Sequence, residues 1–116
     1  MEIGKARALT ARLSQRKQQI AVTLSHVESQ RSEMEKIKDR QDAWTRQRRR
    51  SLLNYLNRWY VREINEINRA LERVSKDKYG SCASCNCAIE TDWLETFPEA
   101  EYCRVCQQMM ERTERI

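Results

Sequence analysis

The stretch "SCASCNCAIETDWLETFPEAEYCRVCQQ" at residues 81–108 holds all five cysteines of this 116-residue chain. Four of them form two Cys-x-x-Cys pairs, Cys82 with Cys85 and Cys103 with Cys106, and seventeen residues separate the pairs. Each pair turns tightly enough to direct two thiolates at one ion, and two pairs complete a tetrahedral sulfur site that suits zinc. We predict one structural Zn²⁺, because four sulfur ligands leave no position for water or substrate.

Two disulfides, or thiols without a shared role, are the alternative for these cysteines. The N-terminal sequence lacks the apolar core of a secretion signal, and no apolar run approaches the roughly 20 residues that cross a bilayer. We therefore expect a cytoplasmic protein without membrane contact, in a reducing compartment where clustered cysteines favour metal binding. Cys87 follows Cys85 too closely for another knuckle, so we expect a free thiol beside the site, with substitution for Cys85 as the alternative.

Two long apolar repeats precede the cysteines, in a segment from Lys5 to Tyr79 that contains neither glycine nor proline. Apolar residues recur seven apart in both halves, which predicts paired amphipathic helices close to a coiled coil. In the first half these are Ala6, Leu13, Ile20, Val27 and Met34, with Ile3 and Leu24 beside them. In the second half they are Leu53, Tyr60, Ile67 and Val74, joined by Leu56, Ala70 and Leu71.

The predicted fold is mostly α: a long antiparallel helical hairpin, then a small four-cysteine zinc-finger module and a short C-terminal helix. We place the hairpin at residues 1–78, with its tip near 38–44, and the zinc module with the helix at 79–116. A charged fraction of 34% with 7% aromatic residues favours long solvated helices over a compact globule. A hairpin covers its own apolar seam, so we expect a monomer; one unbroken helix that dimerises is the alternative.

The net charge of +5 is concentrated in one segment. Residues 36–50, "KIKDRQDAWTRQRRR", contain seven basic and two acidic residues, so their excess equals that of the whole chain. An anionic partner should therefore meet this segment. The single histidine, His26, falls in the first predicted helix far from any cysteine, and we interpret it as a solvated helix residue.

The cysteine segment resembles the DksA/TraR family of bacterial transcription regulators, and the resemblance covers most of the chain. The residues that match the family pattern are Tyr79, Gly80, the four paired cysteines, Ile89, Leu94, Pro98 and Ala100. The resemblance implies a protein that binds bacterial RNA polymerase and does not bind DNA sequence-specifically. It also implies a hairpin that enters the secondary channel of the polymerase and modulates initiation through acids at its tip.

The tip residues that this resemblance implies are Asp39, Asp42, Ala43 and Trp44. The family motif is Asp-x-x-Asp-x-Ala, so both acids are present and Trp44 stands where the family has alanine. Without the resemblance, a structural role explains the two aspartates as well as a functional role does. They would then be turn residues or caps of the second helix.

A cluster of basic residues follows the predicted tip and consists of Arg46, Arg48, Arg49 and Arg50. We interpret it either as a solvated face or as a docking face for acidic walls of the polymerase channel.

The resemblance also shows three substitutions at positions where the family binds its alarmone. The cations that bind the alarmone in the family are replaced here by Trp93, Phe97 and Gln107. Because phosphate recognition needs cationic donors, these replacements argue against the usual response to guanosine tetraphosphate (ppGpp). The glycine that follows the second cysteine in the family is Asn86, which also adopts a left-handed backbone.

The alternative function is nucleic-acid binding by a zinc-containing protein, through the Arg46–Arg50 cluster. The cysteine segment argues against it, because residues 81–101 carry five acids and neither lysine nor arginine. We expect no enzyme activity, since one mid-helix histidine assembles no Ser–His–Asp or Cys–His arrangement.

Overall fold

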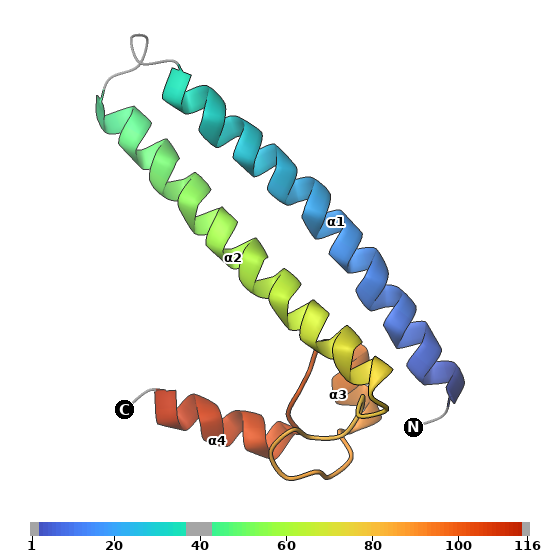
Figure 1. Ribbon diagram of the computed structural model, residues 1–116. Coiled ribbons are helices and arrows are strands. Elements are labelled where there is room, and N and C mark those ends of the chain that lie inside the picture. Colours follow the sequence, from blue (N-terminus) through green and yellow to red (C-terminus); the bar gives the residue numbers. More distant parts are fainter. Residues whose placement is uncertain (1–2, 37–42, 115–116) are drawn as a thin grey trace. The chain divides into compact units, whose positions relative to one another are not determined.

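The computed structural model describes residues 3–36 and 43–114 (Figure 1). Four helices account for most of them: α1 (Ile3–Lys36), α2 (Ala43–Ser75), α3 (Thr91–Thr96) and α4 (Arg104–Glu114). Within these residues, the β structure consists of an isolated antiparallel bridge between Ser81 and Ala88. In the described ranges, no helix is both long and apolar enough to cross a membrane. The predicted mostly-α class and the C-terminal helix are confirmed.

Contacts group the chain into two compact units. Lys17–Asn65 form one, here called the hairpin unit, and Met1–Arg16 with Glu66–Ile116 form the other, the cysteine unit. The predicted division into a hairpin at residues 1–78 and a zinc module with the C-terminal helix at 79–116 stays a prediction.

In the hairpin unit the second half of α1 packs against the first half of α2 (Figure 1). Ile20 and Val27 of α1 and Leu53 of α2 are 1%, 6% and 5% exposed, as their seven-residue spacing predicts. Because α1 packs against α2 within this unit, the chain forms a hairpin and not an unbroken helix. The predicted tip acids, Asp39 and Asp42, lie outside the described residues.

In the cysteine unit Leu13 of α1 and Ile67 and Ala70 of α2 are all buried, as their helical spacing predicts. Thr10 interrupts the apolar repeat. Its hydroxyl donates to the Ala6 carbonyl at 2.7 Å, so this polar group is hydrogen-bonded within its own helix. The prediction was wrong for Ile3, which is 74% exposed. It is the first residue of α1, at the end of the predicted seam.

Helix α2 ends in a backbone motif that turns the chain toward the cysteines. Asp77 adopts a left-handed conformation with φ 56°, and its N–H donates to the Val74 carbonyl at 3.2 Å. The Lys78 N–H donates to the Arg73 carbonyl at 2.8 Å. These two bonds make a Schellman motif, which occupies carbonyls that the helix end would leave unpaired.

The core of the cysteine unit combines residues that lie far apart in the chain. Leu9, Cys82, Ile89 and Leu94 form one buried cluster, and Leu94 is fully buried. Leu94 comes from α3, which lies between the two cysteine pairs in the sequence. Near this core the guanidinium of Arg12 donates to the Glu95 carbonyl at 3.0 Å. The first residues of α1 therefore serve as one wall of the cysteine module.

Candidate metal centre

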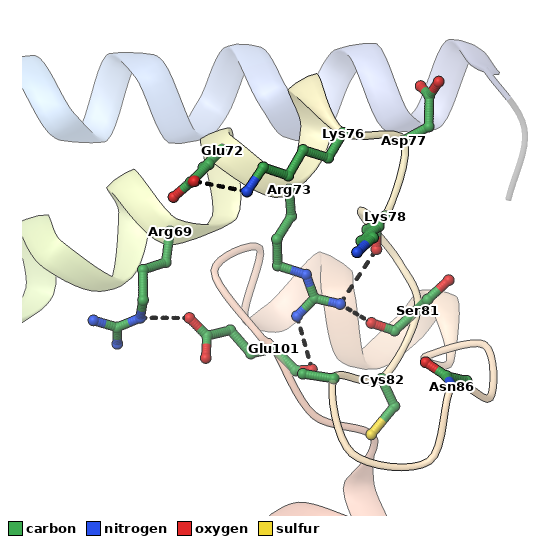
Figure 2. A pocket seen from close by; sticks show the side chains of 11 residues that line it. Arg69, Glu72, Arg73, Lys76, Asp77, Lys78, Ser81, Cys82, Asn86 and Glu101 are labelled. Atoms are coloured by element: carbon green, nitrogen blue, oxygen red, sulfur yellow. Dashed lines mark hydrogen bonds and ion pairs between the residues drawn. The ribbon is translucent and has the colours of Figure 1, made fainter.

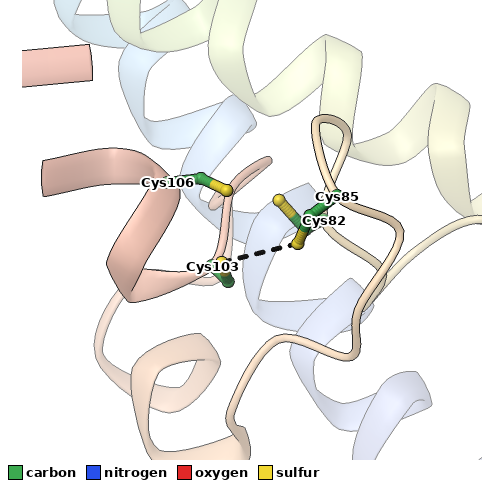
Figure 3. A group of neighbouring side chains, drawn as sticks. All are labelled: Cys82, Cys85, Cys103 and Cys106. Carbon is green, nitrogen blue, oxygen red and sulfur yellow. Dashed lines mark hydrogen bonds between the residues drawn. The ribbon is translucent and has the colours of Figure 1, made fainter. Parts of the chain in front are cut away.

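The sulfur atoms of Cys82, Cys85, Cys103 and Cys106 all lie within 4.8 Å of one another (Figure 3). The Cys85 and Cys103 sulfurs are 3.8 Å apart. A tetrahedral zinc ion with Zn–S bonds of about 2.3 Å places its sulfurs about 3.8 Å apart. All five cysteines lie in the described part of the chain, and none forms a disulfide. The donor set and its spacing therefore fit a four-coordinate metal.

The first knuckle is shaped by two residues with positive φ. Gly80 has φ 87° and Asn86 has φ 62°, so the prediction that Asn86 adopts a left-handed backbone is confirmed. The Asn86 N–H donates to the Cys82 carbonyl at 3.0 Å, and the Cys82 N–H donates to the Cys87 carbonyl at 2.8 Å. The Ile89 N–H closes the loop on the Gly80 carbonyl at 2.7 Å. These bonds direct the thiols of the first pair to the same side of the loop.

The second knuckle leads directly into α4. The Gln107 N–H donates to the Cys103 carbonyl at 2.9 Å, so the first turn of the helix holds both thiols of this pair. The two knuckles also meet through the backbone, because the Ala83 N–H donates to the Glu101 carbonyl at 2.8 Å. The Tyr79 hydroxyl adds a bond of 2.8 Å to the Pro98 carbonyl. Backbone hydrogen bonds therefore hold each pair in place.

The thiols of Cys82 and Cys106 ionise very unequally. Burial opposes ionisation of Cys82, but backbone hydrogen bonds from Cys103, Cys85 and Ser84 lower the pKa of its thiol to about 6. The neighbouring thiols of Cys103 and Cys82 raise the pKa of Cys106 to about 12. A bound metal cation takes a coordinating thiol to its ionised form. The cluster thus suits a cation more than four free thiols.

Burial differs across the cluster. Cys82 is 1% exposed and belongs to the apolar core, Cys103 and Cys106 are half-buried, and Cys85 is exposed. Cys87 is exposed and is not among the four grouped thiols. Its backbone carbonyl, but not its thiol, takes part in the first knuckle.

Arg73 is a residue of this centre that the sequence analysis missed. It projects from the last turns of α2, and its guanidinium donates to the backbone carbonyls of Glu101 at 2.9 Å and Lys78 at 3.2 Å (Figure 2). It also donates to the Ser81 carbonyl. Lys78 and Ser81 precede the first cysteine pair and Glu101 precedes the second. One side chain therefore fastens both knuckles to the end of α2.

A cavity of about 520 Å³ surrounds Arg73, and the charges in its wall are largely paired. Arg69 meets the Glu101 carboxylate at 2.6 Å, and Lys76 meets Glu72 at 2.9 Å (Figure 2). Since Arg73 itself is occupied by three carbonyls, these cations hold the module together and are not a vacant anion site.

The positions that the family resemblance associates with the alarmone hold an aromatic pair and an amide. The rings of Trp93 and Phe97 lie 4.8 Å apart at 55°, and the Gln107 amide donates to Glu111 at 3.3 Å. Arg104 lies 5.0 Å above the Trp93 ring, but its guanidinium meets Asp92 at 3.1 Å. Arg104, a cation next to the aromatic pair, is therefore already paired with a carboxylate.

The basic cluster begins in the first turns of α2. Trp44 is 66% exposed, and the Arg48 guanidinium lies 4.6 Å above its ring. Successive residues of a helix point about 100° apart, so Arg48, Arg49 and Arg50 face different directions. Of the predicted tip residues the structure describes Ala43 and Trp44, and it places Trp44 with Arg48.

No protein-family model matches the chain. Over 61 residues the chain is 34% identical to an uncharacterized protein of Aquifex aeolicus (strain VF5), a match that covers 53% of this chain and 42% of that protein. The chain thus spans less than half the length of this curated relative. Among solved structures it is similar to the transcription factor DksA2 from Pseudomonas aeruginosa, with a TM-score of 0.87 and 22% identity. That likeness covers 100% of this chain and 90% of the other. The chain therefore has the DksA-like fold that its sequence suggested.

Proposed function

We propose that this protein is a bacterial transcription regulator that acts by binding RNA polymerase. The observation that carries the proposal is the likeness to a transcription factor over the full length of the chain, at a TM-score of 0.87. The four grouped thiols support it, because they occur together with the residue pattern of the DksA/TraR family. In that family the hairpin enters the secondary channel of the polymerase.

Cys82, Cys85, Cys103 and Cys106 would hold one structural zinc ion. When bound, zinc neutralises the thiolates and supplies folding free energy to a module with a small apolar core. The backbone bonds of both knuckles and the three bonds of Arg73 orient the ligands for it.

The proposed acting groups are Asp39 and Asp42, at the tip between α1 and α2, with Ala43 and Trp44 following them. Carboxylates delivered to the catalytic centre of the polymerase would perturb its metal ions or the mobile elements around them. The arginines at positions 46, 48, 49 and 50 would steer the hairpin toward acidic walls of the channel. Six arginines and no acid between residues 43 and 62 make this part of α2 suited to that role.

We further propose that the effect of this protein on transcription lacks the ppGpp response that is usual in the family. The aromatic pair Trp93–Phe97 offers no charged donor to a phosphate, and Arg104 is paired with Asp92. Gln107 is an amide whose side chain already bonds Glu111.

The test is transcription in vitro by purified bacterial RNA polymerase from a ribosomal RNA promoter. Wild type is compared with Asp39→Asn/Asp42→Asn, each with and without ppGpp, and binding of both proteins to polymerase is measured in parallel. The proposal expects wild type to alter transcription to the same extent at either ppGpp level, and the variant to bind without effect. Absence of binding by wild type contradicts the polymerase assignment.

A nucleic-acid-binding role is the second candidate, and the acid-free run of arginines in α2 is the observation that favours it. Phosphate contacts make such binding fall steeply with salt. Duplex DNA at several salt concentrations therefore discriminates the two roles, since the polymerase proposal expects weak binding to DNA alone.

A further inference from the structure

One side of α2 in the hairpin unit carries a row of exposed large side chains. Trp44, Leu52, Tyr55 and Trp59 are 66%, 55%, 55% and 56% exposed. With Arg48, whose guanidinium lies over Trp44, they follow one another at intervals of three or four residues. At about 100° per residue the five fall within about 80° of the helix circumference. We call these five residues the aromatic stripe.

The aromatic stripe lies on the side of α2 opposite its buried seam. Leu53, which is 5% exposed, points about 180° away from Trp44 around the helix. The contact between α2 and α1 thus leaves the stripe uncovered. From Trp44 to Trp59 the stripe is about 23 Å long at 1.5 Å per residue. Single exposed apolar residues are ordinary, but a contiguous row of this kind marks an interaction surface.

The charges around the stripe define the chemistry of its partner. Arg48 belongs to the stripe, Arg58 and Arg62 flank it, and residues 43–62 contain no acid. A second copy docking stripe to stripe would bring arginines against arginines. An acidic surface with apolar side chains complements both the charge and the rings.

The composition of the stripe favours a protein over a nucleic acid. Tryptophan, tyrosine and arginine are the residues that dominate binding energy at protein interfaces. Leu52, in the middle, offers a base neither a ring for stacking nor a hydrogen bond. The Arg48 guanidinium covers one face of the Trp44 ring, which removes a stacking surface for a base.

We propose that the aromatic stripe anchors the hairpin on an acidic protein surface that carries apolar side chains. The inference rests on the proposed function, in which that surface belongs to RNA polymerase. It assigns binding to one side of α2 and leaves the effect on transcription to the acids at the tip. Loss of the stripe should therefore weaken binding without changing the effect reached at saturation.

The experiment measures binding of the full chain, labelled at its N-terminus, to purified bacterial RNA polymerase. Tyr55→Ala/Trp59→Ala removes two rings from the stripe, and Leu52→Glu places a negative charge in it with a good helix former. Val22→Ala is the matched control, because Val22 is 59% exposed in the same unit but lies on α1. Both stripe variants should raise the Kd about tenfold or more, and the control should not. All variants should keep the wild-type helicity.

Each result has one meaning. If wild type binds polymerase and both stripe variants bind equally well, the stripe inference is wrong and the proposed function stands. If wild type does not bind, the proposed function is wrong and the inference fails with it. If the stripe variants lose affinity for a single-stranded oligonucleotide but not for polymerase, the stripe serves nucleic acid and the proposal is overturned.

Discussion

Replacing Arg73 with methionine tests whether one side chain holds the metal module in place. The change keeps most of the aliphatic length and removes three hydrogen bonds to backbone carbonyls. The bonds to Glu101 and Ser81 are partly buried, and the bond to Lys78 is exposed. A charged donor contributes about 1.5–3 kcal/mol to a buried hydrogen bond, and partial exposure reduces this to about 1 kcal/mol each.

The expected destabilisation from Arg73→Met is therefore about 2 kcal/mol, most of it from the two partly buried bonds. In a domain of this size that lowers the Tm by roughly 10 °C. Because Arg73 joins both knuckles, the rate at which a chromophoric chelator removes zinc should also rise. Arg73→Lys should recover little of the loss, since one ammonium cannot match a planar guanidinium at three separate carbonyls.

Arg69→Met provides the matched control, one turn earlier in the same helix. Its ion pair with Glu101 is short, at 2.6 Å, but the arginine side chain is 54% exposed, and such pairs contribute under about 1 kcal/mol. The assay is thermal unfolding followed by circular dichroism, together with the kinetics of zinc release. If Arg73→Met changes the Tm and the release rate no more than Arg69→Met does, the bridging role of Arg73 is refuted.

Three further predictions concern the stability of the core, the loss of folding stability at alkaline pH and the binding of the metal. Leu9→Ala should cost about 2–4 kcal/mol in chemical denaturation, because Leu9 is 3% exposed in the core that contains Leu94; a loss like that of the control Val22→Ala would contradict this. Burial raises the pKa of Tyr79 to about 12, so its ionisation favours the unfolded state and stability should fall between about pH 10 and pH 12. Tyr79→Phe should flatten that decline and cost about 1 kcal/mol at neutral pH, where it loses the bond to Pro98; an unchanged alkaline slope would contradict the assignment. Chelation of zinc, or Cys103→Ser, should abolish stoichiometric zinc binding by elemental analysis and lower the Tm, whereas Cys87→Ser should retain one zinc per chain.

Repeating patterns let the sequence predict the hairpin and the grouping of the thiols. The seven-residue spacing identified Leu13, Ile20 and Leu53, because each side of a helical seam repeats with the helix period. The cysteine spacing predicted a common site because a Cys-x-x-Cys pair is defined by local backbone geometry. The prediction that Ile3 belongs to the buried seam was wrong, because periodicity assigns a residue to the seam whether or not another side chain packs over it.

The missed features depend on contacts between distant segments. Leu9 lies in the core around Cys82, and no local signal distinguishes it from other apolar residues of α1. The six-residue α3 is too short to display a helical period. An arginine near the end of a helix is common, so nothing in the sequence singled out Arg73 as the bridge between the knuckles. The residues of the aromatic stripe lie outside the seam positions of α2, so the seven-residue apolar repeat does not include them.

The cysteine unit unites Met1–Arg16 with Glu66–Ile116, and this has a consequence for the order of folding. The bond from Arg12 to Glu95 joins residues 83 positions apart. During synthesis the early turns of α1 therefore wait for the last part of the chain before their apolar side can be covered. Closure of this unit should be a late event that coincides with metal loading. A cell short of zinc would then accumulate chains with Leu9 uncovered, which suits recognition by chaperones and proteases.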